Sequence, residues 1–383
     1  MDGVYCNSML SAAERQRYAR QITLPEIGEQ GQERLLAARI LIVGAGGLGS
    51  PAALYLAAAG VGSLGLIDFD AVDITNLHRQ LLHGTRDVGR AKVDSARERL
   101  TDVNPHVRLE THHESLTSAN ALSVISGYDL VIDASDNFPT RYLLNDAGVL
   151  TGVPVIYGSV ERFEGQVSIF GADDGPCYRC LFREPPPPNL VPTCAEAGVF
   201  GVLPGLVGML QATEAIKRVT NVGDPLIGRL LIVDAKRMRF RTIDVRRDAS
   251  CPLCGTREQK VLIDYEAFCG LPSAKKAPEL DITPRALAQR IASGTAPLLV
   301  DVREAWEYQI ARLPHAELHP GSSLNPDNPG FSRDREVVLY CHSGRRSLYW
   351  LMMLRERGFD RVSHLHGGID AWSVEVDPSV PRY

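Results

Sequence analysis

Cys341 lies in the segment "YCHSGRRS" (340–347), between an apolar strand-like run and a helix-like run. A thiolate at the start of a helix is favoured by the helix dipole and by nearby cations, here Arg345 and Arg346. Such a cysteine can carry sulfur as a persulfide, attack phosphate esters or be an inert buried thiol. Phosphate cradles of the C-x5-R type need an arginine where this chain has Ser347. The smaller loop, with Gly344 permitting its tight turn, favours sulfur chemistry.

Two C-x-x-C pairs, "CYRC" and "CPLC", account for half of the eight cysteines. Four thiolates suit a closed, tetrahedral Zn²⁺ site with a structural role. A redox pair is the alternative for a single C-x-x-C, but two pairs in one chain favour metal. The predicted zinc ligands are Cys177, Cys180, Cys251 and Cys254.

The glycine loop "GAGGLG" (44–49) follows an apolar strand-like run and opens a helix-like run. Helix N–H groups behind such a loop can face a phosphate, and Asp68, which closes the next strand, can bind ribose hydroxyls. This pattern indicates a nucleotide without choosing between NAD and ATP. The cations Arg79 and Lys92, with Asp136 at a strand end, favour a triphosphate and its Mg²⁺.

These residues require a parallel sheet whose strand ends meet at one edge. Strand-like and helix-like runs alternate up to about Gly165, which predicts a doubly wound, mostly parallel α/β sheet. The segments "QVSIF" and "LLIVDAKRMRFRTIDV" alternate at period two and predict an antiparallel extension. From Asp281 the pattern restarts as a small α/β domain. We expect domains at 11–256 and 281–383, joined by a linker at 257–280.

The composition predicts an ordinary globular protein of 383 residues with a formal net charge of −5, which gives no footprint for nucleic acid. No apolar run is long enough to cross a membrane, and the N-terminus does not resemble a signal peptide. We therefore expect a cytoplasmic protein that does not bind membranes.

The segments "RYARQ", "GAGGLGS", "DFDAVDITNLHRQ", "GRAKVDSA" and "DASDN" occur in this order between Ser11 and Gly255. They resemble the bacterial ubiquitin-activating-enzyme-like adenylyltransferases of the MoeB/ThiF type. The resemblance implies an enzyme that uses ATP and Mg²⁺. Its substrate is a small ubiquitin-like sulfur carrier protein, whose C-terminal Gly-Gly becomes an acyl-adenylate with loss of pyrophosphate.

The resemblance also implies roles for individual residues. Asp68 holds the ribose, Gly47 lies against the phosphates, Lys92 balances phosphate charge, and Asp136 holds Mg²⁺ with Asn137 beside it. Arg20 matches an arginine that reaches the phosphates of a neighbouring subunit, which implies a homodimer. The residues expected to line the nucleotide are Asp70, Thr75, Asn76, Leu77, His78 and Arg79.

Cys194 follows a proline-rich segment. In the related ubiquitin-activating enzymes a loop cysteine here can take the acyl group as a thioester, and in sulfur-carrier enzymes it can form an acyl-disulfide. A small residue packed under the loop is the alternative. Cys6 and Cys269 have no comparable context, and we interpret them as incidental.

The blocks "LLVDVREAWEYQIARLPHA", "VVLYCHSGRRS" and "LHGGIDAW", between Leu280 and Arg382, resemble a single rhodanese domain. This resemblance implies a sulfurtransferase in which Cys341 carries a persulfide inside a cradle of backbone N–H groups. Asp301 and Arg303 are expected to brace the loop. The implied sulfur source is a persulfide donor such as a cysteine desulfurase.

Together the two domains predict adenylation of the carrier followed by sulfur transfer from Cys341, which gives a C-terminal thiocarboxylate. An NAD(P)-linked oxidoreductase with a rhodanese domain and a non-enzymatic scaffold for ubiquitin-like proteins are the alternatives. The sequence does not choose the pathway among molybdenum cofactor, thiamin, cysteine, tRNA thiolation and thio-siderophore biosynthesis.

Overall fold

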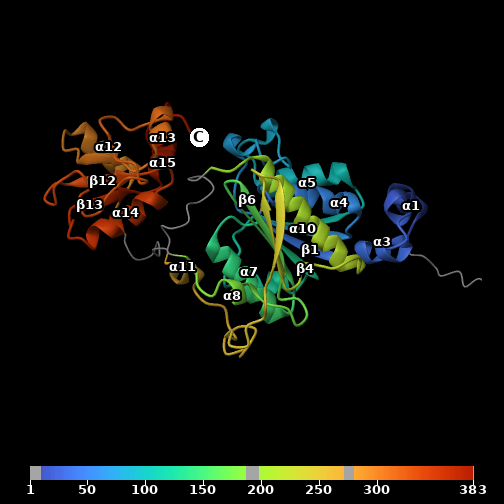
Figure 1. Ribbon diagram of the computed structural model, residues 1–383. Helices are drawn as coiled ribbons and strands as arrows, with labels where there is room; N and C mark the ends of the chain where they lie inside the picture. The colour runs from blue at the N-terminus through green and yellow to red at the C-terminus, as the bar shows by residue number, and fades with distance from the viewer. Residues whose placement is uncertain (1–9, 187–197, 271–279, 383) are drawn as a thin grey trace, which may run out of the picture. The chain divides into compact units, whose positions relative to one another are not determined.

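The computed structural model describes residues 10–186, 198–270 and 280–382, apart from the side chain of Arg345. The chain divides into two compact units, Met1–Cys269 and Gly270–Tyr383, and each has its own sheet and its own core (Figure 1). Cys6, Cys194 and residues 271–279 of the expected linker lie outside the described residues.

The first unit is built on an eight-stranded sheet of order β3-β2-β1-β4-β5-β6-β7-β8. The first five strands in this order are parallel and the last three are joined antiparallel, which confirms the predicted sheet and its extension. The strands are β1 (Arg39–Val43), β2 (Ser63–Ile67), β3 (Arg108–His112), β4 (Leu130–Asp133), β5 (Val155–Glu161), β6 (Glu164–Phe170), β7 (Arg229–Asp234) and β8 (Arg239–Asp244).

Helices α4 to α7 occupy the connections between the parallel strands, which is the doubly wound arrangement. The described helices of this unit are α1 (Ala12–Arg17), α2 (Ala19–Ile22), α3 (Gly28–Ala37), α4 (Gly49–Ala59), α5 (Lys92–Val103), α6 (Ala121–Ile125), α7 (Phe138–Thr151), α8 (Tyr178–Leu181), α10 (Val202–Thr220) and α11 (Tyr265–Phe268). Two short 3₁₀ turns, Ile74–Asn76 and Thr85–Asp87, follow β2.

The sheet is covered on both faces because its central strands are apolar at successive positions. In β1, Ile40 and Ile42 join a core with α4 and α10, whereas Leu41 and Val43 join a second core with α7. A strand buried on both faces is the pattern expected of a parallel sheet between two helical layers. Helices α4 and α7 each end at a glycine, Gly60 and Gly152, which takes the left-handed conformation at the C-cap.

The segment after the second cysteine pair begins as part of the first unit. Tyr265 and Cys269 are buried in the core that contains α7, although we expected linker here. Apolar side chains at Leu262, Ile263 and Phe268 pack beside them, which gives the segment burial that a free linker lacks.

The second unit is a five-stranded parallel sheet of order β11-β10-β12-β13-β9 with a hydrophobic cluster on each face. Its strands are β9 (Asp281–Ile282), β10 (Leu298–Asp301), β11 (Glu317–Leu318), β12 (Val337–Tyr340) and β13 (Val362–Leu365). Its helices are α12 (Pro284–Ala292), α13 (Ala305–Ile310), α14 (Arg345–Arg355) and α15 (Gly368–Glu375). Among the described residues, no helix has the length and apolar character needed to span a membrane.

Candidate nucleotide, metal and sulfur sites

The ends of three parallel strands bring the predicted nucleotide residues together. Val43 of β1 is the register partner of both Ile67 of β2 and Asp133 of β4. The glycine loop, Asp68 and the segment 133–137 therefore leave the sheet at the same carboxyl edge. This edge is where open α/β sheets bind ligands.

The glycine loop is packed too closely for larger residues at two positions. Gly44 has φ +100°, and a Cβ there would stand 2.7 Å from the carbonyl oxygen of Ala134. A Cβ on Gly49 would stand 1.9 Å from the carbonyl oxygen of Gly44. A Cβ on Gly47 would stand 3.0 Å from Cβ of Pro204, so the start of α10 lies against the loop. The loop is held in a compact turn at the start of α4.

Asp68 connects the glycine loop to the segment after β2. Its Oδ2 accepts a hydrogen bond from the Ala45 amide, and its Oδ1 accepts one from the Asp70 amide, both at 2.8 Å. Burial raises the pKa of the Asp68 carboxyl, and the positive charge of Lys92 opposes that rise. The Nζ of Lys92, whose side chain is 6% exposed, lies 2.7 Å from Oδ2 of Asp70. A buried ammonium and two carboxylates thus meet beside the loop.

The segment 73–79 forms a turn that fixes its own side chains. Asp73 caps the 3₁₀ turn Ile74–Asn76, with its Oδ1 accepting from the amide and hydroxyl of Thr75. Arg79 donates to the Asn76 Oδ1 at 2.7 Å and to the Thr75 carbonyl at 3.1 Å, and its guanidinium lies 2.9 Å from Nε2 of His78. These contacts orient the Arg79 guanidinium without any ligand.

The remaining residues predicted to bind the nucleotide make no described contact with the glycine loop. Asp136 is exposed in the turn after β4, and the Asn137 side chain caps α7 by accepting from the Thr140 amide at 3.0 Å. Leu77 lies next to the 3₁₀ turn and is partly buried. Arg20 is exposed on α2. Asp136 is therefore open to a cation, whereas Asn137 has a structural task.

No motif in the sequence points to two buried side chains that stabilise this edge. The His83 ring lies 3.0 Å from the Ala45 carbonyl oxygen and 3.0 Å from the Ser95 hydroxyl, so it braces the glycine loop against α5. Gln211 of α10 donates to the carbonyl oxygen of Asp133, the last residue of β4, and to that of Ile156 in the neighbouring strand β5. Burial lowers the pKa of His83, which favours the neutral ring.

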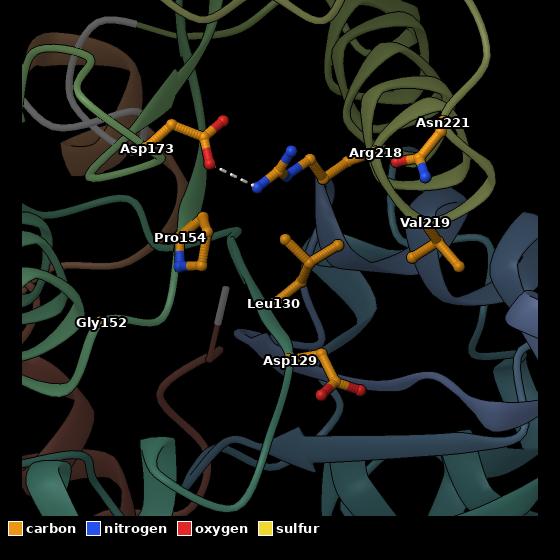
Figure 2. Close-up of a pocket in the computed structure, with 8 residues that line it drawn as sticks. All are labelled: Asp129, Leu130, Gly152, Pro154, Asp173, Arg218, Val219 and Asn221. Carbon is orange, nitrogen blue, oxygen red and sulfur yellow. Dashed lines mark hydrogen bonds and ion pairs between the residues drawn. The ribbon is translucent and has the colours of Figure 1, made fainter.

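A pocket of about 430 Å³ lies elsewhere in the first unit, where β4 and β5 begin and α10 ends (Figure 2). Its lining residues are Asp129, Leu130, Gly152, Pro154, Asp173, Arg218, Val219 and Asn221. Arg218 and Asp173 form an ion pair at 2.9 Å across it (Figure 2). The pocket is at the opposite ends of the strands from the glycine loop and holds none of the predicted site residues.

The four paired cysteines converge. Cys177, Cys180, Cys251 and Cys254 place their sulfur atoms within 4.8 Å of one another. Three of the separations between these sulfur atoms are 3.3 to 3.8 Å, near the roughly 3.8 Å expected between thiolates bound tetrahedrally to Zn²⁺. Contact with Cys177 lowers the pKa of Cys180, and the Asp248 amide, which donates to its sulfur at 3.4 Å, acts in the same direction. The cluster could hold a metal ion.

A buried ion pair attaches this cluster to the sheet. Arg179, inside "CYRC", donates to both carboxylate oxygens of Asp146 on α7 at 2.8 and 2.7 Å. Tyr265 and Gln259, from the segment after the second cysteine pair, donate to the same carboxylate. The cysteine cluster and Asp146 therefore join three segments that are distant in the sequence.

Cys341 lies directly after β12 in the second unit and is 1% exposed. Gly344, with φ +89°, is the N-cap of α14, and its amide donates to the Cys341 sulfur at 3.2 Å. The Ser347 hydroxyl lies 3.5 Å from the same sulfur. The strand–turn–helix geometry matches the predicted loop, with donors directed at the sulfur.

Two ion pairs of described residues lie around this loop. Asp301 and Arg303 are fully buried and form an ion pair at 2.6 Å, and Arg303 also donates to the Ala311 carbonyl. Arg346, which we expected to supply positive charge to the sulfur, forms a bidentate ion pair with Glu307 at 2.7 Å. The Glu307 carboxylate thus neutralises much of the positive charge that Arg346 was expected to supply to the Cys341 sulfur.

These observations define a class: a doubly wound α/β domain with a nucleotide-type glycine loop, joined to a small parallel α/β domain that presents a cysteine at a strand end. Comparison with known proteins agrees. Residues 18–253 match the ThiF family and residues 283–375 match the rhodanese-like domain. The chain belongs to the ThiF family, and it carries a rhodanese-like domain after it.

Curated relatives match either nearly the whole chain or about two thirds of it. The chain is 46% identical to the probable adenylyltransferase/sulfurtransferase MoeZ of Mycobacterium tuberculosis, over 98% of this chain and 97% of that protein. It is 54% identical to the sulfur carrier protein adenylyltransferase of Thermus thermophilus, over 67% of this chain and 97% of that protein. It is 42% identical to the adenylyltransferase and sulfurtransferase MOCS3 of Culex quinquefasciatus, over 99% of this chain and 91% of that protein.

Among solved structures, E. coli MccB with ATP has a TM-score of 0.56 and 21% identity, covering 62% of this chain and 74% of that chain. At this identity the likeness concerns the fold of the first unit alone.

Proposed function

We propose that this protein adenylates the C-terminal Gly-Gly of a small ubiquitin-like sulfur carrier protein and converts it to a thiocarboxylate with sulfur from Cys341. The observation that carries this proposal is that one chain holds both the strand-end nucleotide edge and the Cys341 loop. Relatives of nearly the same length bear both activities in their names. We assign adenylation to residues 11–256 and sulfur transfer to residues 281–383.

ATP fits the nucleotide edge. Ser50 Oγ and Gln80 Oε1 are buried and lack a hydrogen-bond partner among the described residues. Polar atoms left in this state are suited to hydrogen bonds with a bound nucleotide. Lys92 and Arg79 supply cationic groups for phosphates, and Asp136 is an exposed carboxylate for Mg²⁺. ATP supplies the phosphorus that the carrier carboxylate attacks and pyrophosphate as the leaving group. The protein positions these reactants and stabilises charge.

Sulfur transfer then completes the reaction. The terminal sulfur of a Cys341 persulfide attacks the acyl carbon, AMP leaves, and an acyl-disulfide joins the carrier to Cys341. A second thiol attacks the Cys341 sulfur of that disulfide, which releases the thiocarboxylate and leaves a new protein disulfide for an external thiol to reduce. Cys194 is our candidate for the second thiol. The persulfide donor is a cysteine desulfurase or a protein of the same chemistry.

We also propose Zn²⁺ in the four-cysteine cluster, with a structural role because four sulfur ligands leave no open position. A homodimer in which Arg20 of one subunit serves the neighbouring nucleotide is part of the proposal. The NAD(P)-linked oxidoreductase and the non-enzymatic scaffold have no support among the relatives.

The decisive experiment compares the full-length protein with its Cys341→Ala variant. With a Gly-Gly-ending carrier, the variant keeps carrier-dependent ATP–pyrophosphate exchange and loses thiocarboxylate formation from a persulfide donor. Mass spectrometry of the carrier measures the exchange of oxygen for sulfur. Cys269→Ser, a change of a buried thiol outside both sites, is the control and keeps both activities. Thiocarboxylate formation by Cys341→Ala at the normal rate contradicts the proposed transfer.

A further inference from the structure

A line of four side chains leads from the Cys341 sulfur to the surface of the second unit. The Ser347 hydroxyl lies 3.5 Å from the Cys341 sulfur and 3.4 Å from Nδ1 of His364. Nε2 of His364 lies 2.6 Å from Oδ1 of Asp281. The first three residues are 0 to 4% exposed, whereas the Asp281 side chain is 26% exposed. The line therefore begins inside the protein and ends at solvent.

Four separate elements supply these residues, so the line is a product of the fold. Cys341 follows β12, and Ser347 stands in the first turn of α14. His364 on β13 and Asp281 on β9 are register partners in neighbouring parallel strands, so their side chains share one face of the sheet. That face carries α14, because Val362, two residues before His364, is buried with Leu351 and Leu354.

The surroundings of His364 favour a neutral ring that can accept a proton. Burial lowers the pKa of His364, and the Asp281 carboxylate opposes that effect. Oδ1 of Asp281 lies 2.6 Å from Nε2, although the angle between them is not that of a hydrogen bond. The negative charge of this carboxylate favours a proton on Nε2, which leaves Nδ1 as an acceptor. His366, which directly follows β13, lies 3.1 Å from the other oxygen of Asp281. Ser347 faces the ring from α14, and its hydroxyl also lies 3.1 Å from the Gly344 carbonyl, its alternative acceptor.

We propose that Ser347, His364 and Asp281 form a relay that removes the proton of the Cys341 thiol when sulfur is loaded. This rests on the proposed function, in which Cys341 becomes a persulfide. The thiol gives its proton to the Ser347 oxygen, and the Ser347 hydroxyl gives its own proton to Nδ1 of His364. The resulting imidazolium lies against the Asp281 carboxylate, which stabilises the charge. Ser347, His364 and Asp281 are positioning residues, since Cys341 alone touches the transferred sulfur.

The step balances. The Cys341 sulfur attacks the terminal sulfur of the donor persulfide, so one S–S bond forms at Cys341 and the donor's S–S bond breaks. The electron pair leaves with the donor thiolate, which takes a proton from solvent. His364 later returns its proton to solvent at the exposed end of the line. After the transfer the remaining Ser347 hydrogen points at the sulfur, where it and the Gly344 amide stabilise the anion.

The test measures alkylation of Cys341 by iodoacetamide against pH in the full-length protein, with the modified peptide identified by mass spectrometry. Loading from cysteine persulfide is followed at the same peptide. We expect His364→Gln and Ser347→Ala to shift the alkylation midpoint to higher pH by about one unit and to slow loading at neutral pH by roughly a hundredfold. Ser347→Thr keeps the hydroxyl and restores both values. His319→Gln, a histidine of the same unit away from the line, leaves them unchanged.

Alkylation profiles and loading rates of His364→Gln and Ser347→Ala that coincide with the unchanged protein overturn the relay. Circular dichroism and ATP–pyrophosphate exchange show whether each variant is folded. If His364→Gln loses its fold, Asp281→Asn at the exposed end replaces it and carries the same expectation in smaller degree. Failure of the proposed function is recognised separately, because it removes exchange or thiocarboxylate formation from the unchanged protein while the alkylation profiles still test the relay.

Discussion

Asp68 shows how a single carboxylate can organise a site. One of its oxygens fixes the amide of Ala45 in the glycine loop, and the other fixes the amide of Asp70, whose side chain pairs with Lys92. The carboxylate is buried at a strand end, and burial alone disfavours its charge. The nearby ammonium of Lys92 and the two amides offset that cost. The loop, the acid and the cation therefore hold one another in place.

Replacement of this carboxylate by an amide tests its role. We expect Asp68→Asn to raise the KM for ATP in pyrophosphate exchange about tenfold, because an amide keeps one acceptor oxygen and places a donor against a backbone amide. Asp102→Asn changes an exposed carboxylate on α5 and is the matched control. An unchanged KM for Asp68→Asn shows that the carboxylate does not serve the nucleotide.

Residues inside motifs were predictable, and the residues that support them were not. The positions of Asp68 and of Asp136 followed from the ends of apolar runs, because parallel strands align their carboxyl ends. His83 and Gln211 bind the same edge through backbone carbonyls, and a contact to a carbonyl leaves no pattern in the sequence. The sequence shows that Arg346 is a cation close to Cys341. It does not show that Arg346 pairs with Glu307, because Glu307 lies on another helix.

At the scale of elements, the four-cysteine cluster ties α8 to the segment after β8. Arg179 and Asp146 then tie α8 to α7, which packs on the sheet. The cysteine pairs lie more than seventy residues apart in the chain, as the separation of Cys180 from Cys254 shows. A metal ion bound here would close a long loop, and closing a long loop restricts the unfolded chain.

Removal of zinc tests this element. We expect a chelator, or Cys251→Ser, to remove stoichiometric zinc. The melting temperature then falls by roughly 10 °C, because the thiolates lose the metal ion that links them. Elemental analysis and thermal denaturation measure the two effects. Cys269→Ser, outside the cluster, keeps its zinc. A Cys251→Ser protein with full zinc content and unchanged melting contradicts the assignment.

The glycine loop gives a second test at this scale, based on space. A Cβ on Gly49 meets the Gly44 carbonyl oxygen at 1.9 Å, whereas a Cβ on Gly46 has only the Gln80 amide nitrogen near it, at 3.5 Å. We expect Gly49→Ala to lower the free energy of unfolding by about 3 kcal/mol and Gly46→Ala to leave it nearly unchanged. Urea denaturation of both variants measures this. Equal stability of the two variants contradicts the described packing.

The elements themselves were largely predictable because their patterns are local. The strand before Gly44, the helix that the glycine loop opens and the antiparallel pair β7 and β8 are predicted from neighbouring residues. The segment around Tyr265 was expected to be linker, because its few apolar residues find partners only on α7 of the folded domain. Burial that depends on distant residues is not visible in a short stretch of sequence.

At the scale of the whole molecule, the two units carry two halves of one proposed reaction, each with its own sheet and core. In the proposed reaction the adenylate forms at the strand ends of the first sheet, and Cys341 holds the sulfur at a strand end of the second. Because both reactions act on one carrier, placing them on one chain raises the local concentration of the second site for the product of the first.

The proposed homodimer makes a prediction about mixtures of variants. Arg20 is exposed on α2, and Lys92 is buried beside Asp70. We expect Arg20→Ala and Lys92→Ala each to lose most pyrophosphate exchange, since each removes a cation from the phosphates. If Arg20 serves the neighbouring subunit, a mixture that exchanges subunits regains activity, because a mixed dimer has one site with both cations. Arg17→Ala, one turn earlier on α1, keeps full activity alone. A mixture that stays as inactive as its parts, after mixed dimers are shown by mass spectrometry, places Arg20 in its own subunit's site or outside the reaction.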